Sequence, residues 1–215
     1  MKSYSTIIFD LDGVIIDQSI GITESVKYAL LKFGIEEKNN DTLLSFIGPN
    51  LKSSFMRVYG FDEKKAMEAV GYYRETYKLK GIYEFKVYEG IASMLSTLSK
   101  EGKKLFVATT KPKAFAETVL KHANIDSYFN FIHGDTMSYD VTKAKMIKMI
   151  LDTLENNDFS NVVMVGDRDS DIYAAKENKI DSIGVTYGFG TVDELRRANA
   201  TMIVNSVSEL KERLR

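Results

Sequence analysis

The sequence predicts an α/β protein with a doubly wound, mostly parallel sheet and an all-helical segment inserted after the first strand. From residue 87 onward, short apolar strands alternate with segments of helical periodicity, a pattern typical of parallel sheets covered by helices on both faces. Between residues 20 and 79 the apolar spacing is helical, with little strand character. We therefore expect an α/β core domain formed by residues 1–17 and 86–215, and a helical cap domain formed by residues 18–85.

The individual elements follow from local pattern. The first strand ends in the apolar run at residues 7–9, and the inserted segment carries helical stripes such as Val26 with Leu30 and Ala66 with Val70. A continuous apolar run at residues 161–165 fits a strand with both faces covered. Further helices are expected at residues 90–102, 113–123, 143–154, 171–179 and 191–198. Further strands are expected at residues 104–110, 129–134, 161–167, 181–188 and 201–205.

Composition excludes several classes of function. Apolar residues make up 44% of the chain and charged residues 27%, with a formal net charge of -1, so nothing favours nucleic acid or an anionic membrane as partner. The absence of cysteine excludes disulfides and thiol chemistry and fits a reducing compartment. No apolar run approaches the roughly 20 residues that cross a bilayer, and no signal peptide is visible at the N-terminus. We expect a cytoplasmic protein that acts on a small molecule.

Two carboxylates stand where the first strand meets a loop, in the segment "DLDGV". Residues i and i+2 of a strand point the same way, so Asp10 and Asp12 can face one crevice. Like charges this close repel unless a cation joins them, which suggests acid/base chemistry or a metal, although Asp and Gly are also common in plain turns. An EF-hand is excluded, because its required glycine and glutamate positions hold Ile15 and Gly21.

Other expected strand ends also carry reactive groups. The segment "ATTKP" holds Thr109 and Thr110, a helix opens at Lys143, and "GDRDSD" holds Asp167 and Asp171. Each group alone fits a helix cap or a surface position. Together they would place acidic clusters, a hydroxyl and an ammonium at the edge of the sheet where α/β proteins bind ligands.

These four segments, in this order, resemble the motifs of the haloacid dehalogenase superfamily of aspartate-nucleophile phosphotransferases. The resemblance spans nearly the whole chain and implies a Rossmann-like core. The insertion after the first motif resembles the family's small helical cap of the first type. The phrases "FIGPNL", "GVTYGFG" and "DEL" further resemble the branch of phosphoglycolate phosphatases and 5'-nucleotidase-like phosphatases.

The resemblance implies a Mg²⁺-dependent phosphatase that hydrolyses phosphoglycolate or a nucleoside 5'-monophosphate. Asp10 is implied as nucleophile, Asp12 as acid and base, and Thr109 and Lys143 as groups that bind the phosphate. The implied metal site consists of Asp10, Asp12 through its backbone carbonyl, Asp167 and Asp171. Of these, Asp171 is implied to orient Lys143 or a metal-bound water.

Several points stay open. Val14 replaces a frequent threonine and also occurs in mutases, so a phosphomutase of the β-phosphoglucomutase type is the alternative, and a non-catalytic binding module is a third. Lys145 is an alternative to Lys143, because the proline residues that usually flank this lysine in the family are missing.

Substrate contacts are expected from Gly13 and Thr110, and from Asn50 and Lys52 on a cap loop. We expect a monomer or homodimer. His122 and His133 lack a partner at ligand spacing and are expected to be structural or surface residues.

Overall fold

The computed structural model describes residues 2–136, 141–154 and 158–215. The chain divides into two compact units. The first, the core unit, contains Met1–Asp17 and Val87–Arg215, and the second, the helical unit, contains Gln18–Lys86. Each unit has its own buried apolar interior and is described by itself.

The core unit is built on a six-stranded parallel sheet in the order β5-β4-β1-β6-β7-β8. This confirms the predicted fold class. In chain order the strands extend from β1 first toward β5 and then toward β8, so the order reverses between β1 and β6, where doubly wound sheets bind their ligands. The strands are β1 (Thr6–Phe9), β4 (Lys104–Pro112), β5 (Phe131–Asp135), β6 (Val162–Gly166), β7 (Asp181–Val185) and β8 (Met202–Val204).

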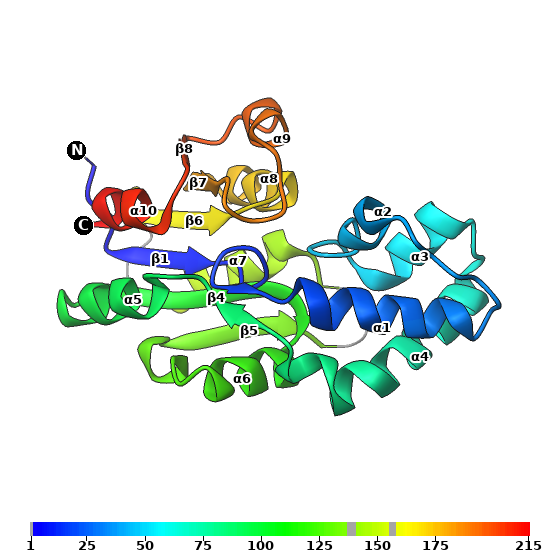
Figure 1. Ribbon diagram of the computed structural model, residues 1–215. Coiled ribbons are helices and arrows are strands. Elements are labelled where there is room, and N and C mark those ends of the chain that lie inside the picture. Colours follow the sequence, from blue (N-terminus) through cyan, green and yellow to red (C-terminus); the bar gives the residue numbers. More distant parts are fainter. Residues whose placement is uncertain (1, 137–140, 155–157) are drawn as a thin grey trace. The chain divides into compact units, whose positions relative to one another are not determined.

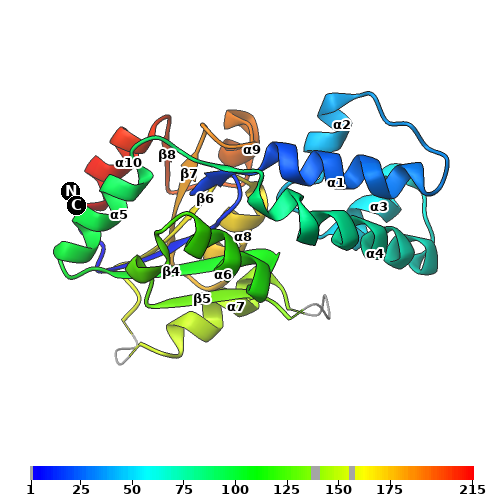
Figure 2. The same ribbon diagram turned by 60° about the horizontal axis from the view of Figure 1, so that its bottom comes forward.

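Helices cover both faces of this sheet (Figures 1 and 2). Ile8 packs with Ile147 of α7 and Ala175 of α8 on one face. Its neighbours Ile7 and Phe9 are fully buried on the other face, as the alternation of a strand requires, and α5 and α10 lie side by side there. The core helices are α5 (Ile91–Lys100), α6 (Lys113–His122), η2 (Asp126–Tyr128), α7 (Lys143–Leu151), α8 (Asp169–Glu177), α9 (Val192–Arg197) and α10 (Val207–Leu214).

The helical unit has an aromatic interior. The rings of Phe46 and Phe55 lie 4.9 Å apart, and those of Tyr73 and Tyr77 are stacked at 5.2 Å. All four side chains are buried, so these aromatics stabilise the unit itself, as their helical spacing predicts. Its elements are α1 (Ser19–Leu31), α2 (Asn40–Leu44), α3 (Leu51–Tyr59), α4 (Glu63–Leu79) and η1 (Gly81–Tyr83). The short strands β2 (Ile16–Asp17) and β3 (Lys86–Val87) pair where the chain passes between the units.

Several elements differ from expectation, three of them for clear physical reasons or by the largest margin. Helix α10 was not expected, although Ser206 caps it by accepting a hydrogen bond from the Glu209 amide. Helix α8 begins two residues before the expected start at residue 171, because Asp171 accepts from the Arg168 amide and closes the first turn. The strand expected at residues 181–188 ends at Val185. Among the described residues, no helix combines the length and hydropathy needed to cross a membrane.

Candidate active site

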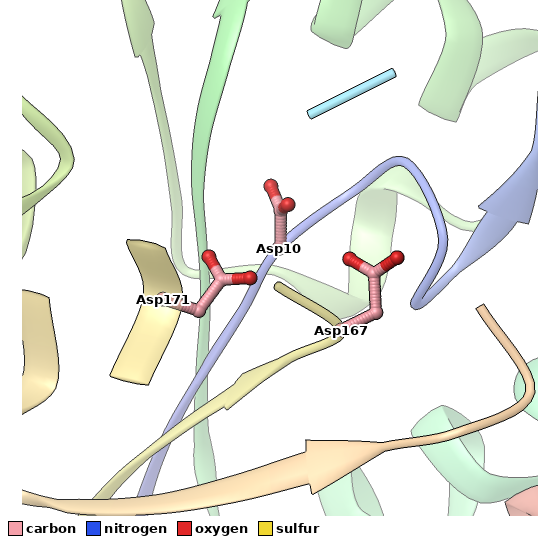
Figure 3. Close-up of side chains that lie close together, drawn as sticks. All are labelled: Asp10, Asp167 and Asp171. Carbon is pink, nitrogen blue, oxygen red and sulfur yellow. The ribbon is translucent and has the colours of Figure 1, made fainter. Parts of the chain in front are cut away.

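Three buried carboxylates converge at the reversal point of the sheet (Figure 3). Asp10 follows β1, Asp167 follows β6, and Asp171 lies in the first turn of α8. One carboxylate oxygen of each lies within 4.8 Å of the others. Three negative charges at this separation repel strongly in a buried environment. The cluster therefore requires positive charge nearby.

Lys143 supplies part of that charge. It is the first residue of α7, which Thr142 caps, and its Nζ lies 2.9 Å from Asp10 Oδ2 and 2.5 Å from Asp171 Oδ1. Burial lowers the pKa of Lys143, but the charges of Asp10 and Asp171 outweigh it and raise that pKa above its usual range. Burial also raises the pKa of Asp171, to about 6. The rival Lys145 is exposed, so the structure brings Lys143 into the cluster.

The carboxylate oxygens of the triad are not equally engaged by the protein. Both oxygens of Asp171 have partners, Lys143 Nζ and the Arg168 amide at 3.0 Å. Asp167 Oδ2 accepts from the Phe189 amide at 2.7 Å. Asp10 Oδ1 and Asp167 Oδ1, in contrast, are buried without a hydrogen-bond partner.

Unpaired buried oxygens of this kind are costly. Leaving a buried acceptor unsatisfied costs about 1–3 kcal/mol, and more for a charged group. Burial, together with the charges of Asp171 and Asp10, raises the pKa of Asp167 well above its usual value. Both effects are relieved by a hard divalent cation, which prefers carboxylate oxygens. Asp10 and Asp167 could hold such an ion through these oxygens, whereas both oxygens of Asp171 already have protein partners.

Glycines enclose Asp167 tightly. Gly13 has φ +86°, and a Cβ there would lie 2.2 Å from Asp167 Oδ2. A Cβ on Gly188 would lie 2.6 Å from Asp167 Cβ, and one on Gly190 would lie 1.7 Å from the Asp167 carbonyl oxygen. Larger residues at these positions would displace the carboxylate. The loop that follows β7 is thus part of the site, which the sequence pattern alone did not indicate.

Asp12 lies outside the acidic triad and has its own cation. Lys111 Nζ lies 2.5 Å from Asp12 Oδ1 and 2.6 Å from Oδ2, and both side chains are buried. Burial raises the pKa of Asp12, and the charge of Lys111 opposes that shift. Lys111 is the lysine of the segment "ATTKP", for which the sequence pattern indicated no role.

The remaining predicted residues lie in different environments. Thr109 is buried on β4, its hydroxyl accepting from the Lys111 amide at 3.2 Å, and Thr110 beside it is half-buried. In the helical unit, Asn50 caps α3 by accepting from the Ser53 amide, and Lys52 pairs with Glu63. Contact of Asn50 and Lys52 with a substrate stays a prediction.

Neither histidine joins a metal cluster within the described part of the chain. His122 is exposed at the end of α6. His133 is half-buried, with its ring 4.4 Å from that of Phe131.

Comparison with known proteins identifies a family and several relatives, most of them named as phosphatases or hydrolases and one as a tyrosine-protein kinase of Mycobacterium tuberculosis, 30% identical over 217 residues and covering 99% of this chain and 73% of that protein. A family model described as haloacid dehalogenase-like hydrolase matches residues 7–185. The chain is 41% identical over 210 residues to a 5'-nucleotidase of Pseudomonas aeruginosa, covering 97% of this chain and 95% of that protein. It is 30% identical over 197 residues to a phosphoglycolate phosphatase of Agrobacterium fabrum, covering 86% and 82%. The crystal structure of a predicted phosphatase from Clostridium acetobutylicum superposes with a TM-score of 0.93 at 44% identity, covering 98% of each chain.

The ion pairs of Lys143 predict a large stability effect. Replacing Lys143 by Met leaves Asp10 and Asp171 buried without their shared cation, so the free energy of unfolding in metal-free buffer should fall by about 3–5 kcal/mol. Lys145→Met, in the same helical turn but exposed, should leave stability near wild type. Urea unfolding of both variants measures this, and equal stability of the two would contradict the assignment.

The close approach of Gly13 to Asp167 predicts a selective loss of metal binding. Gly102 also has positive φ, +76°, but open space around it, so Gly102→Ala tests backbone strain alone, a cost of about 1–3 kcal/mol. Gly13→Ala should add displacement of Asp167 and abolish Mn²⁺ or Mg²⁺ binding in titration calorimetry. Intact binding by a folded Gly13→Ala protein, or equal loss in both variants, would show that the contact is unimportant.

Proposed function

The chain belongs to the haloacid dehalogenase-like hydrolase family, and we propose that it is a Mg²⁺-dependent phosphatase acting on small phosphomonoesters. The observation that carries the proposal is the pair of open, buried oxygens on Asp10 and Asp167 beside the Lys143 ammonium. Such a site suits a cation and a phosphoryl group together, because phosphoryl transfer depends mainly on positioning and on neutralising charge.

Mg²⁺ would be held by Asp10, Asp167 and the Asp12 backbone carbonyl, and when bound it would neutralise the phosphate and orient it. Asp10 attacks phosphorus, forming an aspartyl phosphate as the bond to the ester oxygen breaks. Asp12 gives its proton to that leaving oxygen. It then takes a proton from the water that attacks phosphorus, and the bond from phosphorus to Asp10 breaks.

Other groups bind the transferring phosphate. Thr109 donates its hydroxyl to a phosphate oxygen, and Lys143 lowers the repulsion between phosphate and Asp10. Gly13 and Thr110 are proposed to contact the substrate at the carboxyl edge of the sheet. The Lys143 ammonium beside Asp10 and a bound cation would together let two anions, carboxylate and phosphate, come into contact.

We propose phosphoglycolate or a nucleoside 5'-monophosphate as the substrate class, with relatives of both names supporting the choice. Asn50 and Lys52 are proposed to contact the leaving group. A turnover screen against metabolite phosphates, in which released phosphate is measured, tests the proposal. Conversion of one hexose phosphate isomer into another without phosphate release would favour the phosphomutase alternative, and inactivity toward all esters would overturn the proposal.

Asp10→Asn should abolish turnover while the protein stays folded, because an amide is nearly isosteric with the carboxylate but cannot form the acyl phosphate. We expect a fall in kcat of several powers of ten. Asp169→Asn is the matched control, since Asp169 lies in the same acidic segment but outside the triad. Phosphate release assays on both variants decide the point. Activity of Asp10→Asn above about a hundredth of wild type would exclude Asp10 as nucleophile.

Turnover should require Mg²⁺, stop in chelator and return when the metal is restored, because Asp10 and phosphate otherwise repel each other. Ca²⁺ should inhibit, since its larger and more flexible coordination shell lets Asp10 bind through both oxygens. Steady-state rates in metal-exchanged buffer measure both effects. Undiminished turnover in excess chelator would contradict the metal requirement.

The proposed contacts of Asn50 and Lys52 predict an effect confined to esters with a compact, anionic or polar leaving group. Asn50→Ser with Lys52→Met keeps a residue that can cap α3 but removes the amide and ammonium. The KM for the best metabolite should rise at least tenfold more than the KM for p-nitrophenyl phosphate. Lys64→Met, an exposed change on α4, serves as control. A uniform change in KM for both esters would argue against substrate contact.

A further inference from the structure

Lys111 holds the Asp12 carboxylate by both of its oxygens. The Nζ–O distances are 2.5 and 2.6 Å, and the side chains of Lys111 and Asp12 are 5% and 11% exposed. An ammonium that lies between both oxygens fixes where the carboxylate lies and restricts its rotation. A buried pair of this kind also costs desolvation energy, so it is weak evidence for stability alone.

The backbone of β4 is shaped to aim Lys111 at Asp12. In the pairing of β4 with β5, Thr109 lies opposite Gly134 and Pro112 lies opposite Asp135, so two residues of β4 have no counterpart. Such a bulge re-aims a side chain and is common beside active sites. It also requires glycine opposite, because a Cβ on Gly134 would lie 2.6 Å from the Lys111 carbonyl oxygen.

The two buried lysines of the site serve different carboxylates. Lys143 pairs with Asp10 and Asp171, whereas Lys111 pairs with Asp12. In the proposed function, Asp10 acts on phosphorus and Asp12 acts on the leaving oxygen. Because each lysine pairs with a different carboxylate, Lys143 affects the nucleophile Asp10, and Lys111 affects Asp12, the acid and base.

We propose that Lys111 is a positioning residue that holds Asp12 in place for proton transfer to the leaving group. The inference rests on the proposed role of Asp12. During transfer, one Asp12 oxygen delivers its proton to the ester oxygen as the P–O bond breaks, and the other oxygen stays on the Lys111 ammonium. Without Lys111 the carboxylate rotates, and a poor leaving group departs without its proton.

The test compares two aryl esters of similar shape, phenyl phosphate and p-nitrophenyl phosphate. Phenolate needs protonation far more than p-nitrophenolate does, so only the first ester depends strongly on Asp12. The quantity measured is kcat/KM, because hydrolysis of the phosphoenzyme is common to both esters. Lys111→Met should lower kcat/KM for phenyl phosphate at least ten times more than for p-nitrophenyl phosphate, within the 10²–10⁴-fold range typical of acid catalysis.

Two further variants make the test specific. Lys113→Met, two residues away and half-exposed in a pair with Glu117, should leave the ratio of the two esters unchanged. Lys111→Arg, which keeps a cation with two donors, should restore most of the phenyl phosphate activity.

A double variant tests whether Lys111 acts through Asp12. In an Asp12→Asn background, Lys111→Met should cause no further loss, because residues that act through one another are not additive. This double variant removes both buried charges and so remains informative where Lys111→Met alone fails to fold.

The outcomes separate this inference from the proposed function. Equal losses for both esters, or an additive loss in the Asp12→Asn background, would overturn the role of Lys111 and leave the phosphatase proposal standing. Failure of the wild-type protein to hydrolyse either ester and any metabolite phosphate would overturn both.

Discussion

The Lys143 ammonium lies between two buried carboxylates, Asp10 and Asp171, and the geometry of the core depends on this arrangement. Buried like charges are tolerated only when a cation compensates them. The compensation ties the end of β1 to the starts of α7 and α8, elements that are distant in sequence. It also occupies one oxygen of Asp10 and leaves the other open. The ion pair with Lys143 therefore positions Asp10 and leaves one of its oxygens available to a ligand.

The other carboxylates of the site are also held by specific protein groups. The Phe189 amide donates to one oxygen of Asp167, and a Cβ on Gly13 or Gly188 would clash with the Asp167 side chain. Asp12 is withdrawn from the triad by its pairing with Lys111. Asp10 and Asp171 thus share Lys143, whereas Asp12 and Asp167 have partners of their own. In the proposed mechanism, this difference in surroundings lets four aspartates at one sheet edge take different roles.

Much of this was predictable, because apolar periodicity and strand-end chemistry are local signals. The parallel sheet and the position of Asp10 and Asp167 at strand ends followed from short apolar runs. The bulge that aims Lys111 was not predictable, since it depends on how β4 pairs with β5. The start of α7 at residue 143 was expected, but the choice between Lys143 and Lys145 depended on which side chain is buried beside Asp10, and only Lys143 is. The Phe189 contribution comes from a backbone amide, which residue type does not reveal.

The central claim is that the unpaired oxygens of Asp10 and Asp167 bind a cation. Both oxygens of Asp171, in contrast, stay bonded to protein groups. Anomalous diffraction from crystals grown with Mn²⁺ tests it most directly. The account predicts one strong peak, bonded to Asp10 and Asp167, with Asp171 still paired to Lys143 and the Arg168 amide. A peak coordinated by Asp171 in place of Asp10, or no peak at this edge of the sheet, would contradict it.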